Sequence, residues 1–284
     1  MSSPLRVYLE MIKIEHSVFA LPFAMLGMMW AGGWPGAKVF LLIVVAMVSC
    51  RSAAMAFNRI ADRSIDAQNP RTSMRALPAG LLELRHANLF FLGSCLLFFS
   101  AAWALNPLAL ILSPVALGVT LGYSITKRFT PLCHFVLGLS LGIAPAAAWV
   151  AVRGTLDWEI VPIVFAVMFW TAGFDILYAL QDEEFDREHR LRSLPELLGR
   201  PKALAVSRAC HVGAAILLAV GGIAVGAGGA YFLGVIVASG LLAYEQSLVR
   251  VDDLSKVNLA FFTLNGYVSI GVFGFACLDF LLRR

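Results

Sequence analysis

Apolar stretches long enough to cross a bilayer recur along the whole chain, separated by short segments rich in glycine, proline and charge. A membrane-spanning helix needs ~20 mostly apolar residues. The pattern predicts nine such helices, at about residues 16–33, 38–57, 87–105, 108–126, 132–152, 160–180, 203–222, 228–249 and 257–281. We therefore expect an all-α integral membrane protein, with residues 1–284 forming a single transmembrane domain.

The composition supports this class and excludes an ordinary soluble protein. Of 284 residues, 60% are hydrophobic and 14% are charged, whereas soluble domains are ~25% charged. The first apolar run follows Glu10, carries Glu15 and His16 near its start, and lacks a cleavage site of small residues, so we interpret it as a retained span. The net charge of +4 is better explained by membrane topology than by nucleic acid. The bilayer is thus the predicted surrounding, and no nucleic-acid partner is expected.

The distribution of basic residues predicts the orientation. With the N-terminus in the cytoplasm, nine crossings leave only Lys38, Arg153, Arg283 and Arg284 on the outer side. The other lysines and arginines, of 22 in all, fall on the cytoplasmic side. This asymmetry follows the positive-inside rule. It predicts a cytoplasmic N-terminus and an outer C-terminus.

Two clusters of polar residues, spaced four apart, close the second and the sixth predicted spans. The first motif is Asn58, Asp62 and Asp66, and the second motif is Tyr178, Asp182 and Asp186. Residues four apart share one face of a helix. An offset of 120 residues separates Asp62 from Asp182 and Asp66 from Asp186, and four crossings return the chain to the same side. We therefore expect four carboxylates on one cytoplasmic-side cavity.

Four carboxylates together would repel each other, and desolvating them would be costly. Mg²⁺ resolves this because it prefers carboxylate oxygens and shares its shell with water and substrate phosphates. The plainer alternative is that these are solvated acids in loops. Finding the same spacing twice, in equivalent positions, favours the metal site.

Basic residues beside the motifs would suit a diphosphate ligand. Arg63, Arg71 and Arg75 accompany the first motif, and Tyr123 and Lys127 lie four apart at the cytoplasmic end of the fourth span. Cationic side chains around metal-bound carboxylates match the charge and geometry of a diphosphate. The alternative, that Lys127 and Arg128 are only topology anchors, stays open for Lys127 and is preferred for Arg128.

Two further ionisable residues are predicted within the membrane. Arg51 precedes Asn58 by seven residues, and Asp175 precedes Asp182 by the same separation. Seven residues make two helical turns, so each should point the same way as its motif. Intramembrane charges are functional candidates. Arg51 would hold an anionic group of a second substrate, and Asp175 would orient Arg51 or a hydroxyl, unless the two form a structural ion pair between helices.

These residues resemble the signatures of UbiA-type membrane prenyltransferases. The segment "NRIADRSIDAQNPRTSMRALPAG" is similar to their first signature, "YALQDEEFD" to their second, and "YSITKR" to the element between them. The similarity extends along essentially the whole chain, including "IKIEHSVFALPFAM". It implies a nine-helix fold around a central cavity, in the inner membrane of a prokaryote, with the active site on the cytoplasmic side.

The resemblance also implies an activity: Mg²⁺-dependent transfer of a polyprenyl group from its diphosphate to an aromatic acid in quinone biosynthesis. The metal-binding set would be Asn58, Asp62, Asp66, Asp182 and Asp186. The diphosphate would contact Arg63, Arg75, Tyr123 and Lys127. The aromatic acceptor, a 4-hydroxybenzoate or a hydroxynaphthoate, would lie near Arg51, Asp175 and Tyr178.

One residue departs from the family pattern, because Arg59 stands where quinone-pathway members often carry aspartate. This leaves the acceptor open between a benzoate and a naphthoate.

Two other classes of membrane protein remain as alternatives. A CDP-alcohol phosphotransferase also uses membrane-face aspartates, but in a single motif that begins Asp-Gly. An ion-coupled transporter would place charges near the midplane, whereas the acids here gather at one face.

Overall fold

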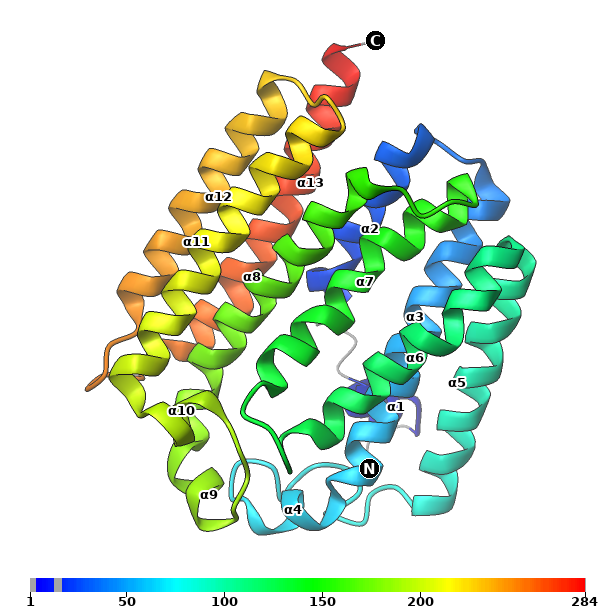
Figure 1. The fold of residues 1–284 in the computed structure, drawn as a ribbon. Helices are drawn as coiled ribbons and strands as arrows, with labels where there is room; N and C mark the ends of the chain where they lie inside the picture. Colours follow the sequence, from blue (N-terminus) through cyan, green and yellow to red (C-terminus); the bar gives the residue numbers. More distant parts are fainter. Residues whose placement is uncertain (1–3, 13–16, 284) are drawn as a thin grey trace. The chain divides into compact units, whose positions relative to one another are not determined.

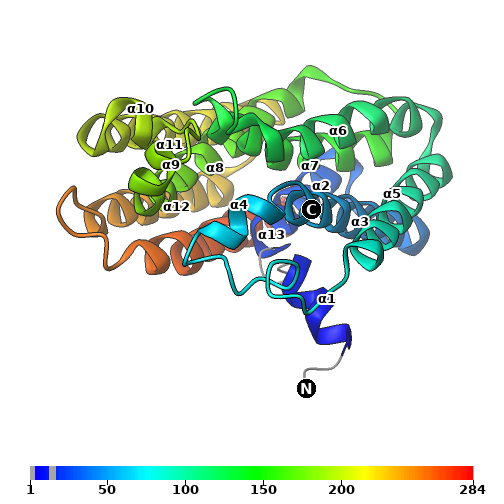
Figure 2. The same ribbon diagram turned by 90° about the horizontal axis from the view of Figure 1, so that it is seen from below.

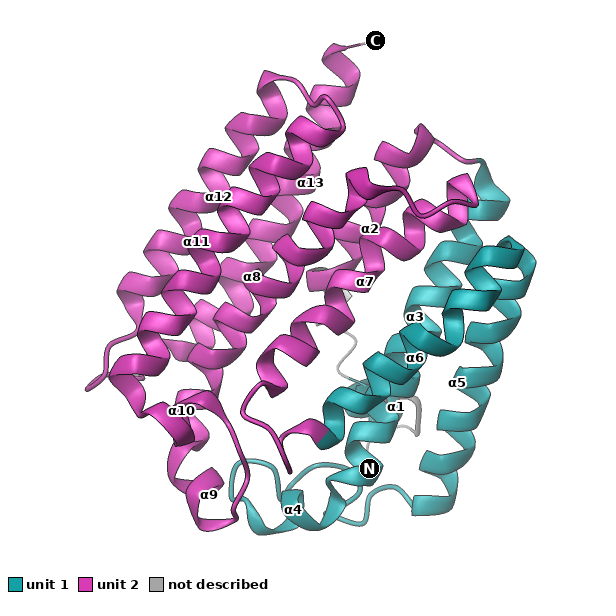
Figure 3. Ribbon diagram, viewed as in Figure 1, with its two compact units in different colours: residues 1–17, 36–125 teal, residues 18–35, 126–284 magenta. Residues whose placement is uncertain are grey.

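The computed structural model describes residues 4–12 and 17–283, and all regular structure in these ranges is helical (Figure 1). The chain forms two compact units: unit 1 contains residues 1–17 and 36–125, and unit 2 contains residues 18–35 and 126–284 (Figure 3). Glu15 and His16, on which the retained first span rested, lie outside the described residues, as does Lys13, one of the cytoplasmic-side basic residues.

Unit 1 is built on a pair of long helices that pack along each other. Its helices are α1 (Pro4–Ile12), α3 (Ala37–Ala61), α4 (Arg63–Gln68), α5 (Leu84–Leu105) and α6 (Pro107–Thr126). Helix α3 packs on α5. Small side chains such as Ala53 and Ala56, both fully buried, allow the close approach, and Phe98 and Leu117 fill the adjoining core. The first motif lies where α3 ends.

Unit 2 is larger, and its core is aromatic. Its helices are α2 (Ser17–Gly32), α7 (Cys133–Arg153), α8 (Val161–Ala179), α9 (Glu183–Glu188), α10 (Leu194–Leu198), α11 (Arg200–Ala224), α12 (Gly229–Leu248) and α13 (Asn265–Leu282). Helix α8 contacts both α7 and α11, and α12 packs on α13, as Figures 1 and 2 show from two directions. The buried rings of Phe23, Trp170, Phe174 and Tyr231 belong to this core. The second motif lies where α8 ends.

Close contact between α7 and α8 depends on two glycines four residues apart. A Cβ atom on Gly138 would overlap the backbone of Met168, and one on Gly142 would overlap the backbone oxygen of Val164. Small residues at this spacing allow transmembrane helices to approach closely. The contact places the start of α7 against the second half of α8, so His134 lies beside Asp175.

The predicted spans agree with the helices, with one difference at the N-terminus. Within the residues that the structure describes, eight helical segments are long and apolar enough to cross a membrane, so the chain is a multi-pass membrane protein. The first predicted span corresponds to α2, which has 16 residues and contains Pro22. At 1.5 Å per residue, the described part of this helix is about 24 Å long. The ninth crossing and the orientation stay predictions.

Candidate functional site

Both motifs adopt a similar local structure, although they lie 120 residues apart. In the first, the long helix α3 ends immediately before Asp62. In the second, α8 ends at Ala179 and a 3-10 helix, Leu180–Asp182, carries the first aspartate. In both, a six-residue helix then carries the second aspartate. Asp62 has φ −95° and ψ 8°, and Asp182 has φ −102° and ψ 4°. These values lie in the sparsely populated bridge region, where many active-site residues are found.

The break corrects the expectation of one uninterrupted helix through each motif. The spacing of four nevertheless survives in unit 1, because the backbone N–H of Asp66 donates to the carbonyl of Asp62 at 2.7 Å. The turn therefore still brings the second carboxylate one helical repeat beyond the first. What changes is the direction of the chain, which leaves the axis of the long helix at the first aspartate.

In unit 1, the second aspartate of the motif is buried against an arginine. Asp66 is 5% exposed, and Nη1 of Arg75 lies 2.7 Å and 2.8 Å from its two carboxylate oxygens. Thr72 donates its hydroxyl to the Asp66 carbonyl at 3.0 Å, which holds the loop after α4 against the motif. Arg75, expected to contact a diphosphate, thus neutralises a predicted metal ligand.

Asn58 stands between an arginine and an aspartate. Its Nδ2 donates to Oδ2 of Asp62 at 3.0 Å, and its Oδ1 accepts from Nη1 of Arg59 at 3.1 Å. Arg59, the departure from the family pattern, is 7% exposed. Because a guanidinium can only donate, it fixes which way the Asn58 amide points. Arg59 therefore orients a residue of the predicted metal-binding set.

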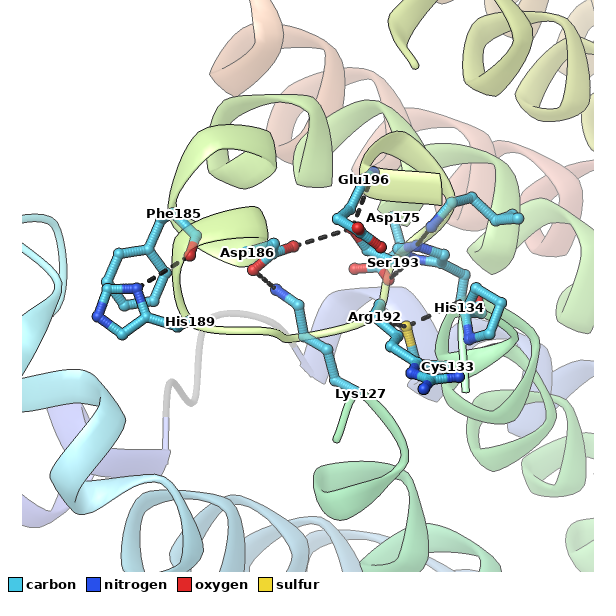
Figure 4. A network of polar contacts seen from close by, with 12 residues as sticks. Lys127, Cys133, His134, Asp175, Phe185, Asp186, His189, Arg192, Ser193 and Glu196 are labelled. Atoms are coloured by element: carbon cyan, nitrogen blue, oxygen red, sulfur yellow. Dashed lines mark hydrogen bonds and ion pairs between the residues drawn. The ribbon is translucent and has the colours of Figure 1, made fainter. Parts of the chain in front are cut away.

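In unit 2, the second aspartate is buried more completely and pairs with a lysine (Figure 4). Asp186 is 0% exposed. Its Oδ1 lies 2.6 Å from Nζ of Lys127, and its Oδ2 accepts from the Ser193 hydroxyl at 2.9 Å. Ser193 also accepts from the backbone N–H of Glu196 and so caps α10. Lys127, like Arg75, is bound to a predicted metal ligand.

A histidine connects the loop around the Lys127–Asp186 ion pair to α8. His134, buried at the start of α7, has its Nδ1 2.6 Å from Oδ2 of Asp175, and its Nε2 accepts from the backbone N–H of Leu194 at 3.3 Å. Because a backbone N–H only donates, Nδ1 carries the ring proton and donates it to Asp175. The backbone N–H of Arg192 donates to the Lys127 carbonyl at 2.7 Å. One loop thus connects Lys127, His134 and Asp186, as Figure 4 shows.

The other predicted residues are distributed over both units. Arg51 on α3 and Tyr123 on α6 are half-buried in unit 1, and Arg63 is exposed at the start of α4. Tyr178 stacks on Phe261, with ring centroids 4.3 Å apart, and Asp182 is 9% exposed. The structure therefore pairs each second aspartate with a predicted diphosphate ligand within its own unit. Arg51 and Asp175 belong to different units.

The donor set fits a divalent cation of the hard, oxygen-binding kind. Within the described residues, no three His, Cys, Asp or Glu side chains gather closely enough to cage a metal. Each motif supplies two carboxylates, and the first also supplies an amide oxygen. Mg²⁺ is usually held by one or two carboxylates with waters and substrate phosphates completing its shell. The residues match that shared mode rather than a cage made of protein alone.

Sequence reasoning missed His134 and Ser193, and it left Arg59 without a role. A single histidine at the edge of an apolar run is more often a packed residue than a functional one, and a lone serine before a short helix signals only a cap. The one available signal for His134 was its position after a turn, in the membrane, opposite an intramembrane aspartate. Ionisable residues in spans need partners, so Asp175 implied one.

Residues 20–267 match the model of the UbiA prenyltransferase family. The chain belongs to the UbiA prenyltransferase family. Among the curated members, the chain is similar to a 4-hydroxybenzoate octaprenyltransferase of Vibrio cholerae serotype O1, with 30% identity over 272 residues that cover 94% of this chain and 95% of the relative.

Solved UbiA structures share the fold. The apo structure of a UbiA homologue from Aeropyrum pernix superposes with a TM-score of 0.82 at 33% identity, covering 95% of this chain and 98% of the other. A UbiA homologue from Archaeoglobus fulgidus bound to GPP and Mg²⁺ has a TM-score of 0.74 at 21% identity, covering 96% and 99%. The all-helical UbiA fold predicted from the motifs is therefore confirmed.

Proposed function

We propose that this protein is an aromatic prenyltransferase of quinone biosynthesis, which transfers a polyprenyl group from its diphosphate to 4-hydroxybenzoate or a hydroxynaphthoate. Family membership supports the reaction class, and curated members of similar length carry the name 4-hydroxybenzoate octaprenyltransferase. The observation that carries the proposal is the repeated local structure, in which a bridge-region aspartate is followed by a buried, cation-paired aspartate in both units.

The proposed metal ion is Mg²⁺, held by Asn58, Asp62, Asp66, Asp182 and Asp186. When bound, it would neutralise charge that builds on the leaving diphosphate. Structures of a UbiA homologue from Archaeoglobus fulgidus have been solved with GPP and Mg²⁺ and with Cd²⁺, and the oxygen donors of this chain suit such an ion.

The chain's own residues would bind and orient the two substrates. Lys127 and Arg75 would move from their carboxylates to the diphosphate, where Arg63 and Tyr123 would also donate, and these charges would favour cleavage of the allylic C–O bond. The allylic cation would then be attacked by a ring carbon ortho to the acceptor hydroxyl, and loss of the ring proton would restore aromaticity. Surrounding apolar helices would exclude water from the cation.

Arg51, Asp175 and Tyr178 would receive the aromatic acid. Arg51 offers a guanidinium to the carboxylate of the acceptor. The Asp175 carboxylate is held by His134, so it would present its oxygen to the acceptor hydroxyl in one orientation. Tyr178, stacked on Phe261, would form an aromatic wall.

The proposed setting is the inner membrane of a prokaryote, with nine crossings, a cytoplasmic N-terminus and the reaction on the cytoplasmic side. Residues 1–284 would act as one catalytic domain. The basic residues of the loops support the orientation. Cysteine labelling of the loops in intact and permeabilised cells would test it.

The activity test uses purified protein with a polyprenyl diphosphate and radiolabelled 4-hydroxybenzoate or dihydroxynaphthoate. Label should enter the lipid-soluble fraction only when Mg²⁺ is present, and the mass of the product would identify the acceptor and the chain length. Turnover by Asp62→Ala and Asp182→Ala equal to that of the unmodified protein would sink the metal assignment. Failure to release diphosphate with any aromatic acid would favour the transporter instead.

A further inference from the structure

Three arginines surround a hollow that the proposed reaction does not use. The hollow has a volume of about 470 Å³ and lies in unit 2, lined by Pro131, Arg187, Arg190, Leu191, Arg192, Glu196 and Leu197. None of these side chains was assigned to a substrate or to the metal. All three arginines are exposed, so their charged ends are accessible from outside the protein.

Positive charge exceeds negative charge around this hollow. Glu196 is the single acid in its lining. Arg187 pairs with Glu183 at 2.8 Å, but Glu183 is shared with Arg200 at 2.9 Å. No carboxylate of a described residue lies within ion-pair distance of Arg190 or Arg192. Like charges held together repel, and an anion between them would remove that repulsion.

The backbone at the centre of this cluster adopts a conformation that side-chain-bearing residues rarely take. Arg190 has φ 54° and is the one non-glycine residue of the described chain with a positive φ. Arg190 follows the C-cap of α9, a position where a left-handed residue commonly ends a helix. The backbone N–H of Leu191 donates to the Asp186 carbonyl at 2.8 Å, which fixes the turn that points Arg190 outward.

Apolar side chains border the same hollow. Leu197 lines it and is 59% exposed, and Leu132, next to the lining residue Pro131, is 54% exposed. The hollow lies where α8 and α9 lead into α10, at the end of long apolar helices. Cations beside exposed leucines at the end of membrane spans match a molecule with a phosphate at one end and a hydrocarbon part at the other.

We propose that Arg187, Arg190 and Arg192 form a binding site for a phosphate-bearing anion, separate from the aspartate motifs. The headgroup of an anionic membrane lipid is the source that the neighbouring leucines favour. Free inorganic diphosphate presents the same chemistry and is the second source to test. Arginine suits either, because its planar fork binds phosphate oxygens in pairs.

The site is joined to the proposed reaction centre through the chain. Arg192 donates its backbone N–H to the Lys127 carbonyl, and the next residue, Ser193, donates its hydroxyl to Asp186. An anion that orders this loop would therefore also order the Lys127–Asp186 pair. The binding site itself does not depend on the proposed activity, so it is tested by binding.

The experiment measures retention of phosphatidylglycerol by the full-length protein in nanodiscs of zwitterionic phosphatidylcholine, using native mass spectrometry. The double variant Arg190→Gln with Arg192→Gln should bind the anionic lipid more weakly, by about fivefold for each arginine removed. The matched control is Lys202→Gln with Arg208→Gln, which removes the same charge from exposed positions on α11 and should leave binding unchanged. Arg190→Gly is a second variant that removes the side chain and suits the left-handed backbone.

A parallel arm measures binding of inorganic diphosphate in detergent, with a chelator present so that no divalent cation contributes. Weaker lipid binding with unchanged diphosphate binding would identify the headgroup as the ligand, and the reverse would identify the free anion. If the double variant and Arg190→Gly bind both ligands as the unmodified protein does, the proposal is overturned. An equal loss in the control would overturn it too, because the arginines would then act only through net charge.

Discussion

The two aspartate motifs have similar backbone conformations at their first aspartate but segments of opposite net charge. Residues 58–75 contain four arginines and two aspartates, whereas the equivalent residues 178–195 contain five acids and three arginines. The first is therefore a cationic segment and the second an anionic one. Since both must serve one diphosphate and its metal under the proposed function, the difference suggests a division of work. The first motif is better suited to the anion and the second to the cation.

The motifs also differ in how their buried carboxylate is held. Asp66 is bound by Arg75, nine residues further along the same loop. Asp186 is bound by Lys127 and Ser193, and Lys127 precedes it by 59 residues. The first arrangement can form locally, whereas the second needs the α6–α7 connection and the α9–α10 loop to be in place. The two motifs repeat in sequence, but their buried carboxylates are held by different kinds of contact, one local and one between distant segments.

The largest expected effect comes from removing either buried carboxylate. Asp66→Asn and Asp186→Asn should each lower the prenyl-transfer rate about 100-fold or more, because each removes a charge proposed to hold the metal beside the diphosphate. Initial rates at saturating substrate and Mg²⁺ would measure this. Asp252→Asn, on an exposed loop, is the matched control. A loss in one variant but not in the other would break the functional equivalence of the motifs.

The next largest effect is the loss of stability on replacing Arg75 or Lys127. Arg75→Gln removes both bonds to the Asp66 carboxylate, whereas after Lys127→Gln the Ser193 hydroxyl still donates to Asp186. Breaking a buried pair costs about 3–5 kcal/mol, and since Arg75 and Lys127 are about a third exposed, we expect roughly 1–2 kcal/mol, larger for Arg75→Gln. Denaturation in detergent would measure it. Equal losses would show that Ser193 adds nothing.

A histidine supports only the second of the two motifs. His134→Asn keeps a donor near the Nδ1 position and should keep the bond to Asp175, whereas His134→Gln places its amide nearer Nε2 and should lose that bond. We expect kcat to fall about tenfold in the Gln variant and less in the Asn variant, with the KM for the diphosphate unchanged. Full kinetic profiles with both substrates would show the split. If both variants lose only thermal stability, His134 is a packing residue.

The smallest effect belongs to an aspartate outside both motifs. The pKa of the partly exposed Asp157 carboxyl is lowered from its usual 3.8, first by the hydrogen bond from the Trp149 indole and then by that from the Thr155 hydroxyl. A lowered pKa stabilises the fold at neutral pH, and this contribution is lost as the pH falls from the unfolded value through the folded one. Between pH 5 and pH 3, the range in which carboxyl groups ordinarily titrate, the unfolding temperature of the unmodified protein should therefore fall slightly more than that of the Asp157→Asn variant.

Hydropathy predicted the helices well, because crossing a bilayer leaves little choice of structure. The bounds predicted for 108–126 and 132–152 lie within a residue or two of Pro107–Thr126 and Cys133–Arg153. The short helices α1, α4, α9 and α10 were not predicted. They lie outside the predicted spans, where the sequence has no long apolar run. Segments of five to nine residues are also too short to show a helical period of apolar residues.

The residues of the candidate site were predicted from the sequence, but the ion pairs between them were not. Spacing of four identified Asp62 and Asp66 because helical periodicity connects them. No period connects Asp66 to Arg75 or Asp186 to Lys127, and those contacts depend on how loops fold back. The end of α3 at Asp62 could not be predicted from the spacing, because the Asp62 carbonyl still accepts a hydrogen bond from the Asp66 backbone N–H, as it would in a continuous helix. The roles proposed for Arg51, Tyr123 and Tyr178 stay predictions.

The Lys127–Asp186 pair has a thermodynamic consequence. Under the proposed function, the Lys127 ammonium group would compete with a divalent cation for the same carboxylate oxygen. A diphosphate that draws Lys127 away releases Asp186, so each ligand would strengthen the binding of the other. Linkage requires the two enhancements to be equal. A free enzyme of this design would bind metal weakly and diphosphate weakly, and would bind the two tightly only as a pair.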